Sequence, residues 1–330
     1  MKKAIGLLVC VLMVLGVLIG CTQESSPTKA DAKKVKIGIV QSIEHTSLTQ
    51  IREAIIKRLD ELGYNESNTE IDYKNAQGDQ ATLNSICTQF QGDKKDIVIP
   101  IGTTSTHAVC GTINNTKIVF SAVTDPVGAG FVKAFDQTDN NVTGISDTFP
   151  LNSIFELAMQ MTPDIKKIGF IHCTSEQGAK KIIEDAKVEL NKNFKELAYI
   201  DTTISNASEL QQAVQSMVGK VDAIFVPNDN VVASAMPTLS EIARENKIPV
   251  YVTADSLVMD GGLATVGINY TDVGRETSNM VVEILKGKPI SEVPVKSVGK
   301  YRKVINQTTA DRIGVKLSDE IKKDAEIVTD

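Results

Sequence analysis

Residues 35–63 read VKIGIVQSIEHTSLTQIREAIIKRLDELG, and this stretch decides the fold. An apolar run opens it, and a segment with Ile51, Ile55 and Leu59 on one helical face follows. Gly63 suits the end of that helix, because glycine adopts the left-handed conformation found there at little cost. A buried strand followed by an amphipathic helix is one unit of an α/β fold.

The same alternation continues along the chain. Further strands are predicted at 71–73, 96–101, 117–123, 141–146, 167–173, 196–200, 223–227 and 249–253, and helices at 79–91, 103–110, 151–161, 176–191, 208–218 and 231–246. Apolar runs without period-2 alternation, separated by amphipathic helices, are typical of parallel sheets covered on both faces. The sequence therefore predicts an α/β protein with Rossmann-like, parallel sheets.

The series breaks at 147–150 and then restarts, which predicts two lobes. We assign a strand at 265–269 and a helix at 271–285 to the first lobe, and the segments 293–298, 303–305 and 318–325 to the second. The expected division is 35–147 plus 256–287 for lobe 1, and 148–255 plus 288–330 for lobe 2. Three crossings between two such lobes predict a hinged clamshell.

The N-terminus has the layout of a secretory signal. Lys2 and Lys3 precede an apolar run that ends in Leu18-Ile19-Gly20-Cys21. The run is slightly short for a transmembrane helix, which needs about 20 apolar residues. The ending resembles a bacterial lipobox, which implies cleavage before Cys21 and lipidation of its sulfur. We expect a lipoprotein signal peptide at 1–20 and a flexible linker at 21–34. An uncleaved membrane anchor is the alternative. Either interpretation places the rest of the chain outside the cytoplasm.

Composition narrows the classes of partner and chemistry. Without the two signal lysines the chain carries 33 basic and 41 acidic residues, a balance of −8, which argues against nucleic acid as a partner. Cys87, Cys110 and Cys173 remain after the signal and Cys21, and their apolar surroundings predict free buried thiols rather than a disulfide. The chain has three histidines and no Cys-x-x-Cys pair, so neither a metal site nor a cofactor is expected.

Ligands of open α/β sheets bind beyond the carboxyl ends of the strands. The residues that directly follow the predicted strands are small and polar. They are Gln41, Glu44, His45, Thr103, Thr104, Ser105, Ser121, Thr124, Asp125, Ser146, Asp147, Ser175, Glu176, Asn228, Asp229, Asn230 and Asp255. We therefore predict that the ligand site lies among them.

Two features of this set suggest a zwitterionic ligand. Gly102-Thr103-Thr104-Ser105 opens a predicted helix, where backbone N–H groups and hydroxyls suit a carboxylate or a phosphate. Asp147, Glu176, Asp229 and Asp255 could hold an ammonium group through charge-assisted hydrogen bonds. Each feature has a second interpretation, since hydroxyl and carboxylate side chains also cap helices.

Catalysis has little support in the sequence. Glu44 and His45 are adjacent, but a general base needs a nucleophile or substrate proton within reach, and no Gly-x-Ser-x-Gly motif is present. We therefore expect a protein that is not an enzyme. Tyr270 could stack on a flat ligand, although packing is the more common role of a single aromatic residue.

Several stretches together resemble a known family. They are Lys36–His45, Ile101–Ser105, Phe120–Gly130, Val142–Asp147, Val226–Asn230 and Gly267–Gly274. They resemble the TrpX-like substrate-binding proteins of ABC transporters, which have the type I periplasmic binding protein fold. The resemblance covers essentially all of 35–315. One departure is Gln177-Gly178, where the family often has Asn-Ser.

The resemblance implies a receptor for tyrosine, tryptophan or phenylalanine that passes its ligand to a membrane permease. Thr103, Thr104, Ser105 and Ser121 would take the ligand carboxylate. Asp147, Glu176 and Asp229 would take the amine, and Gln41, Glu44 and His45 would lie near the side chain. We expect a lipid-anchored, extracytoplasmic monomer. A surface adhesin or sensor with the same fold is the alternative. A hydrolase is disfavoured because the sequence lacks a nucleophile motif, and a repressor-type regulator is disfavoured because it lacks an N-terminal helix-turn-helix.

Overall fold

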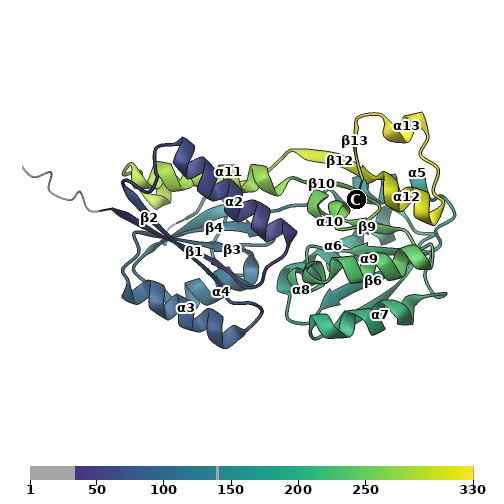
Figure 1. The fold of residues 1–330 in the computed structure, drawn as a ribbon, viewed down its shortest axis with the longest axis horizontal. Coiled ribbons are helices and arrows are strands. Elements are labelled where there is room, and N and C mark those ends of the chain that lie inside the picture. The colour runs from purple at the N-terminus through teal and green to yellow at the C-terminus, as the bar shows by residue number, and fades with distance from the viewer. Residues whose placement is uncertain (1–33, 139–140, 330) are drawn as a thin grey trace, which may run out of the picture. The chain divides into compact units, whose positions relative to one another are not determined.

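The structure is a computed structural model that describes residues 34–138 and 141–329. From Lys34 onward the chain forms one compact unit, which contains two sheets with helices on both faces of each (Figure 1). The α/β prediction with two mainly parallel sheets is confirmed. The predicted signal peptide 1–20, the lipidation site Cys21 and the linker up to residue 33 lie outside the described residues.

The first sheet has six strands in the order β11-β5-β4-β3-β1-β2, all parallel. Its strands are β1 (Val35–Gln41), β2 (Thr69–Asn75), β3 (Ile97–Ile101), β4 (Lys117–Val123), β5 (Val142–Ser146) and β11 (Lys296–Ser297). One face carries α2 (Thr46–Glu61) and α11 (Tyr270–Leu285), and the other carries α3 (Gln80–Gly92) and α4 (Thr103–Thr112) (Figure 1).

The second sheet has seven strands in the order β13-β12-β10-β9-β8-β6-β7. They are β6 (Lys167–Cys173), β7 (Ala198–Ile204), β8 (Ala223–Val226), β9 (Val250–Val252), β10 (Ala264–Ile268), β12 (Tyr301–Asn306) and β13 (Ala325–Val328). Only the β10–β12 pair is antiparallel among the pairs in this sheet.

Helices cover both faces of the second sheet as well. They are α5 (Leu151–Met161), α6 (Gln177–Asn193), α7 (Leu210–Met217), α8 (Asn230–Ser234), α9 (Met236–Glu245), α10 (Asp255–Met259), α12 (Gln307–Ile313) and α13 (Asp319–Lys322). Neighbouring residues of β6 serve opposite faces: Phe170 packs in the cluster with α5 and α6, and Ile171 in the cluster with α7 and α9. Short 3-10 turns occupy Ala207–Glu209 and Ile290–Glu292.

The central strand β1 shows why its sequence is suited to a buried position. Ile37 and Ile39 point into the core beneath α2, and Val40 points to the opposite face. Gly38 lies on that second face too, where an added Cβ would be 2.8 Å from the ring of Phe90 on α3. The glycine therefore lets α3 pack directly against the sheet.

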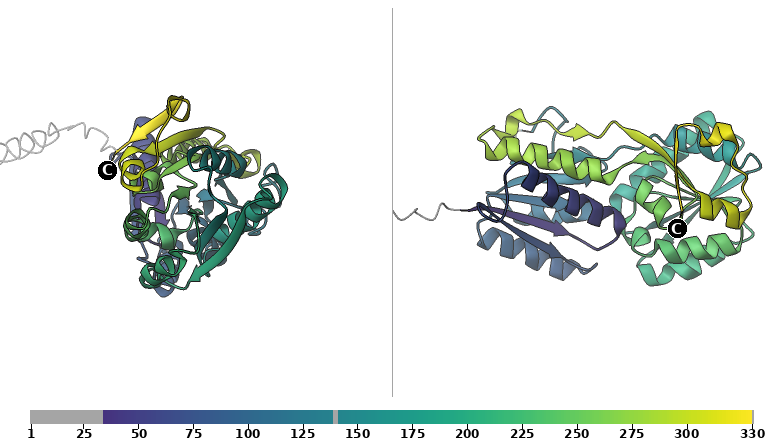
Figure 2. Two further views of the ribbon diagram at one scale, coloured as in Figure 1. Left: turned by 90° about the vertical axis from the view of Figure 1, so that its right-hand side faces the viewer. Right: turned by 45° about the horizontal axis from the view of Figure 1, so that its top comes forward.

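The sheet membership of two late strands differs from the prediction. β10 was expected in the first lobe, but it pairs with β9 and β12 of the second sheet. β11 was expected in the second lobe, but it pairs with β5 of the first. Local apolar patterns specify a strand and not its partner. The chain crosses between the sheets three times, after β5, between β10 and α11, and between β11 and β12 (Figure 2). The number of crossings is therefore as predicted, but the positions predicted near 255 and 287 are wrong.

Two predicted helices also differ. The helix expected at 231–246 is divided into α8 and α9, because Pro237 lies in the first turn of a new helix and cannot continue the old one. The helix expected at 318–325 is only Asp319–Lys322, followed by the edge strand β13. Neither difference moves a residue of the predicted site.

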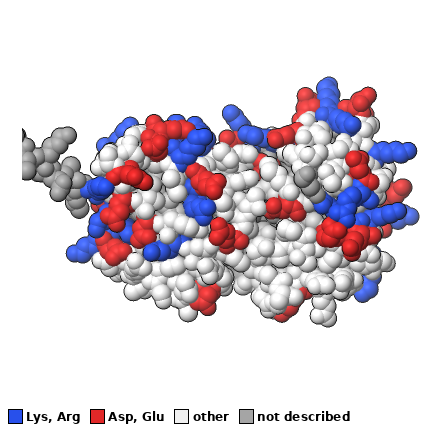
Figure 3. Space-filling model, in the orientation of Figure 1, with Lys and Arg blue, Asp and Glu red and all other residues white. Residues whose placement is uncertain are grey.

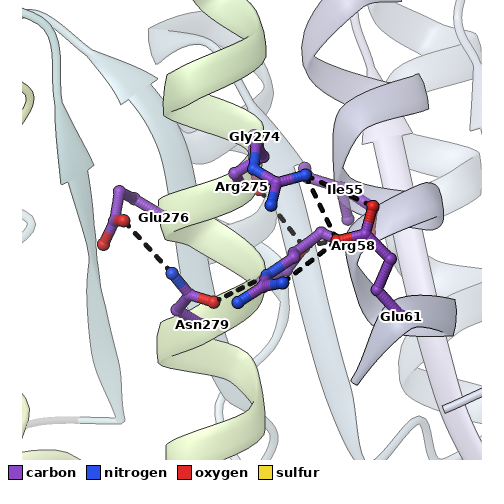
Figure 4. Close-up of polar contacts among 8 residues, drawn as sticks. Ile55, Arg58, Glu61, Gly274, Arg275, Glu276 and Asn279 are labelled. Atoms are coloured by element: carbon purple, nitrogen blue, oxygen red, sulfur yellow. Dashed lines mark hydrogen bonds and ion pairs between the residues drawn. The ribbon is translucent and has the colours of Figure 1, made fainter. Parts of the chain in front are cut away.

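Helices α2 and α11 pack closely through a glycine (Figure 4). A Cβ on Gly274 would be 2.5 Å from the backbone oxygen of Ile51. Polar contacts border this approach: Arg58 Nε donates to Asn279 Oδ1 at 3.0 Å, and Glu61 pairs with both Arg58 and Arg275. The return of α11 to the first lobe is therefore fixed by close packing and by a charge network.

The surface has no broad basic area on the face shown in Figure 3, where acidic and basic side chains are interspersed. Within the described part of the chain, no helix combines the length and the apolar character that a membrane crossing requires.

Candidate functional site

The strand ends of the two sheets meet along a seam that is bridged by hydrogen bonds. At one end of it, near α2, Thr46 Oγ1 donates to Asp260 Oδ1 at 2.9 Å. The hydroxyls of Ser47 and Ser256 are also hydrogen-bonded, at 2.7 Å. On the α4 side, His107 Nε2 and Gln177 Oε1 are 3.0 Å apart. The two lobes are thus in direct contact around the predicted site.

A buried polar chain crosses the middle of the seam. His45 Nε2 lies 3.1 Å from Asn230 Oδ1, and Asn230 Nδ2 donates to Glu176 Oε2 at 2.9 Å. Thr104 Oγ1 donates to the other oxygen of Glu176 at 3.4 Å. Four predicted site residues from both lobes therefore form one connected network.

Burial changes the ionisation of this network. It raises the pKa of Glu176 to about 7, and the nearby carboxylate of Asp229 adds to the effect. Burial also lowers the pKa of His45 to about 4, so its imidazole is neutral at pH 7. A positive charge placed beside Glu176 would therefore favour the ionised form of its carboxyl.

Asp147 occupies the crossing from β5 to the second lobe. Asn228 Nδ2 donates to its Oδ2 at 2.7 Å, and the Tyr270 hydroxyl donates to the same oxygen at 3.4 Å. The carboxyl is fully buried, and burial raises its pKa to about 7. Its second oxygen, Oδ1, has no partner at hydrogen-bond geometry, although the Thr124 side chain is near enough to the carboxyl to lower its pKa. Asp147 thus keeps one acceptor free at the point where the lobes join.

Other buried atoms around the seam also lack partners. Among the described residues, six of the eight buried polar side-chain atoms without a hydrogen-bond partner are at these strand ends. They are Gln41 Oε1, His45 Nδ1, Ser105 Oγ, Asp147 Oδ1, Thr253 Oγ1 and Asp255 Oδ1. Buried polar atoms in proteins are nearly always paired, so a cluster of exceptions needs an explanation, and a bound ligand supplies one.

The N-terminus of α4 fits an anionic group. Gly102 precedes the helix with φ of +83°, a conformation that glycine adopts readily, and no side chain caps the helix. Thr103 and Ser105 are buried in the first turn, and the Ser105 hydroxyl is unpartnered. A helix of ten residues with free N–H groups and an unpaired hydroxyl at its start can bind a carboxylate.

Two cavities open between the lobes on either side of the seam. One, of about 280 Å³, is lined by Thr124, Asp125 and Asp147 with Phe135, Phe149 and Leu151 among its apolar walls. The other, of about 240 Å³, is lined by Thr104, Ser175 and Glu176 with Ile43, Leu83 and Val231 as apolar walls. Predicted site residues therefore line both cavities.

Gly178 lies in the first turn of α6 and faces the first lobe. A Cβ there would be 3.0 Å from Thr124 Oγ1 and 3.4 Å from Thr103 Oγ1. At Gln177-Gly178 the sequence departs from the family pattern. Gln177 is hydrogen-bonded to His107 of the first lobe, and at Gly178 a larger residue would come close to Thr124.

Some predicted residues use their polar atoms elsewhere. The carboxylate of Asp229 accepts from the backbone amides of Cys173, Val231 and Val232, so it caps α8 and ties it to β6. The hydroxyl of Ser121 is hydrogen-bonded to Thr277 of α11 at 2.7 Å. These contacts favour the structural interpretation of both residues.

Four more predicted residues lie at the rim or turn away. Glu44 is exposed, pairs with Arg52 and accepts from Asn75. Asp125 accepts from the amide of Gly128 in a turn, and the Ser146 hydroxyl donates to a backbone oxygen of Thr124. Ser175 is exposed, with its hydroxyl 3.2 Å from the sulfur of Cys173.

Sequence reasoning gave little weight to Thr253 and Tyr270. Thr253 is the last residue of the predicted strand 249–253 and is not in the candidate set, although Ser121 and Ser146, which also lie within predicted strands, are. Tyr270 is buried and donates to Asp147, a role that its position two residues after β10, at the start of α11, could have suggested. Asp255, which was predicted, accepts from Asn269 through Oδ2.

Three cysteines lie within the described residues, and none of them forms a disulfide. Cys87, Cys110 and Cys173 are free; Cys87 and Cys173 are buried and Cys110 is half-buried. Burial raises the pKa of Cys87 to about 11 and that of Cys110 to about 12, so both are protonated. In the described ranges no group of three or more His, Cys, Asp or Glu side chains could hold a metal ion.

Comparison with known proteins adds independent information. Residues 36–329 match the family model of ABC transporter substrate binding proteins. A tyrosine-binding protein of Clostridioides difficile (strain R20291) is 37% identical, with 98% of this chain and 99% of that protein aligned.

Two solved structures are also similar. An ABC domain from Streptococcus pneumonia in complex with L-Trp has a TM-score of 0.86 at 33% identity, covering 90% of this chain and all of that one. The ligand-free, open form of a Clostridium difficile substrate binding protein with adhesive properties has a TM-score of 0.68 at 36% identity, covering 89% and 99%. The lobes here thus resemble the L-Trp complex more than the open form.

More distant solute binding proteins of ABC transporters share the fold, which confirms the predicted type I periplasmic binding fold. The family match covers both sheets and every strand end that lines the seam. This chain belongs to the ABC transporter substrate binding protein family.

Proposed function

We propose that the protein captures an aromatic amino acid, namely tyrosine, tryptophan or phenylalanine, between its lobes and passes it unchanged to an ABC importer permease. The observation that carries this proposal is the set of six unpartnered polar atoms at the strand ends. Binding of tyrosine by one relative and of L-Trp by another supports the ligand class.

Each end of an amino acid has a matching group in the seam. The ammonium would contact Asp147 Oδ1 and lie in the same seam as Glu176, whose carboxylate lines the ring cavity, because a positive charge there favours both ionised carboxylates. The carboxylate would lie at the start of α4, with Ser105 Oγ as an additional donor.

The side-chain ring would occupy the 240 Å³ cavity walled by Ile43, Leu83 and Val231. A cavity of about 150 Å³ is known to hold benzene, so this space is sufficient. We assign ligand contact to Gln41, His45, Thr104, Ser105, Asp147, Glu176, Asn228, Asn230 and Asp255, and a supporting role to Asp229 and Ser121.

Thermal denaturation with each of the twenty amino acids tests the ligand class. A ligand that binds only the native state raises the melting temperature by mass action. We expect an increase with tyrosine, tryptophan or phenylalanine and its loss in Thr104→Ala and Asp147→Ala. The absence of any response to these three amino acids would exclude the class, and an unchanged affinity in both variants would place the site elsewhere.

We also propose that the mature protein begins at Cys21, is held at the outer face of the membrane by lipid on that sulfur, and acts as a monomer. Cys21→Ala should abolish incorporation of a labelled fatty acid and release the protein from the membrane fraction. Retention of the label in that variant would contradict this assignment.

Adhesion is a second candidate function, favoured by the adhesive properties of the similar Clostridium difficile protein. It would use an outer surface and not the seam. Host-cell attachment by a deletion strain, complemented with wild type or with Asp147→Ala, separates the two functions. Attachment restored equally by both copies would support adhesion independent of the ligand.

A further inference from the structure

Two of the hydrogen bonds that join the lobes lie outside both cavities. Thr46 Oγ1 donates to Asp260 Oδ1 at 2.9 Å, and the hydroxyls of Ser47 and Ser256 are 2.7 Å apart. None of these four residues lines either of the two cavities beside the seam. The start of α2 in the first lobe is therefore joined to α10 and the residue after it in the second lobe, away from the space assigned to the ligand.

The start of α2 has no cap from its own segment. Its N-cap residue, His45, makes no side-chain hydrogen bond to the first turn, and that turn contains no acidic residue. Glu44, which precedes it, pairs with Arg52 and accepts from Asn75. The first N–H groups of a helix have no intrahelical partner and carry a partial positive charge, which a nearby carboxylate stabilises.

The second lobe supplies a carboxylate at this position. Asp260 Oδ1 accepts from Thr46, which is the first residue of α2. The backbone of Asp260 is held within the second lobe, because its amide donates to the Ser256 carbonyl at 3.0 Å and its own carbonyl accepts from Ser240 Oγ at 3.1 Å. The carboxylate therefore reaches the start of α2 only when the lobes are together.

We infer that Asp260 is a positioning residue for ligand binding, whose carboxylate caps α2 across the seam and holds the lobes closed without contacting the ligand. Ser47 and Ser256 extend the same contact. The inference rests on the proposed function and adds a part of closure that is independent of which ligand is bound. An apparent dissociation constant scales inversely with the fraction of protein in the binding-competent state, so loss of this contact weakens every ligand by the same factor.

Titration calorimetry with tyrosine, tryptophan and phenylalanine tests this inference. Asp260→Ala should raise the dissociation constant of each ligand that the wild type binds by about three- to tenfold, the range typical of one hydrogen bond. Asp201→Ala is the matched control, because Asp201 pairs with Lys187 inside the second lobe, and its loss removes the same charge without touching the seam. It should leave all affinities unchanged. Unchanged affinity in Asp260→Ala, a factor that differs among the ligands, or an equal loss in the control would overturn the inference.

Two further variants separate the charge from the hydrogen bond. Asp260→Asn keeps an acceptor oxygen for Thr46 and removes the charge, so it should cause a smaller loss of the same kind. Thr46→Val removes the hydroxyl and should also weaken all ligands alike. Added to Asp260→Ala it should cost nothing more, because the partner of the hydroxyl is already absent. Losses that multiply in the double variant would show that the two residues do not act together.

A measurement without ligand keeps this inference distinct from the proposed function. If the wild type binds none of the three amino acids, the proposed function fails, and the radius of gyration from small-angle X-ray scattering then decides the inference. It should be larger for ligand-free Asp260→Ala than for the wild type and Asp201→Ala. Equal radii for all three proteins would show that Asp260 does not hold the lobes together.

Discussion

At the scale of single residues, the buried carboxylates differ in what their oxygens do. Burial raises the pKa of both acids, but Asp147 has a free acceptor oxygen, whereas the oxygens of Asp229 accept from three backbone amides. Both follow strands and both looked equally suited to bind an ammonium in the sequence. Which of the two roles a carboxylate takes depends on amides contributed by other segments, and sequence position alone does not reveal these.

Replacing each acid should separate the two roles. Asp147→Asn should weaken tyrosine binding by about 2 kcal/mol, roughly thirtyfold, because it removes a charge-assisted contact. It should not lower the melting temperature without ligand, since the native carboxylate is buried at a cost. Asp229→Ala should lower that temperature by removing a helix cap, a loss of about 1–2 kcal/mol. Titration calorimetry measures the tyrosine affinity, and thermal denaturation measures the melting temperature without ligand. Unchanged affinity in Asp147→Asn together with an unchanged melting temperature in Asp229→Ala would contradict the assignment.

The raised pKa values of the buried carboxyls also predict a pH dependence, and those of Asp229, Asp255 and Asp260 shift in the same direction as those of Asp147 and Glu176. Asp147 and Glu176 titrate near 7 in the folded protein, above their usual values of 3.8 and 4.5. The folded form therefore binds more protons than the unfolded form between about pH 4 and 7, and stability without ligand should fall as the pH rises through this window.

Ligand binding should show the opposite trend. An ammonium favours the ionised carboxylates, so the affinity for tyrosine should increase from pH 5 to 8, and binding at pH 6.5 should release protons. Calorimetry in buffers of different ionisation enthalpy detects the release. A pH-independent affinity, with no proton release, would show that neither acid contacts the ammonium.

At the scale of elements, most strands and helices could be predicted from apolar periodicity, and the α/β alternation followed from them. The exceptions have physical reasons. β11 is only two residues long, and β10 is a short strand whose partners are decided by the path of the chain across the hinge. The break between α8 and α9 depends on Pro237, which a hydrophobic pattern alone does not register.

The start of α6 offers a prediction about closure. Gly178→Ala should favour the helix, because alanine is the better helix former by about 1 kcal/mol. Its Cβ, however, would lie 3.0 Å from Thr124 Oγ1 when the lobes are together. We expect a few-fold weaker affinity for tyrosine with an unchanged or higher melting temperature without ligand. Gly111→Ala in α4 is the matched control, since nothing lies within 4 Å of an added Cβ there, and unaltered affinity in both variants would contradict a closing role for this contact.

The α2–α11 contact makes a separate prediction about stability. A Cβ at Gly274 would be 2.5 Å from the Ile51 oxygen and 2.7 Å from Ala54 Cβ, so Gly274→Ala must push the helices apart. Overpacking of this kind usually costs about 1–3 kcal/mol. Chemical denaturation should show the loss, with tyrosine affinity changed little because α11 packs away from the ring cavity. An unchanged free energy of unfolding in this variant would show that the two helices can move apart without loss of stability, and it would contradict this prediction.

At the scale of the whole molecule, the two lobes are built so that their strand ends face each other and leave polar atoms unpaired between them. The sequence indicated this arrangement because residues after strands were unusually polar. It could not indicate which residues would be brought within bonding distance, since Thr104 and Glu176 or His45 and Asn230 meet only when both lobes are in place. The similarity to the L-Trp complex agrees with lobes closed on a small ligand.

The most direct test of the account is a crystal structure of the protein saturated with tyrosine. We predict intact tyrosine between the lobes, with its ammonium within hydrogen-bond distance of Asp147, its carboxylate at the first turn of α4 and its ring beside the segment 41–45. Tyrosine bound on an outer surface, or in the seam without contact to Asp147 and α4, would contradict it.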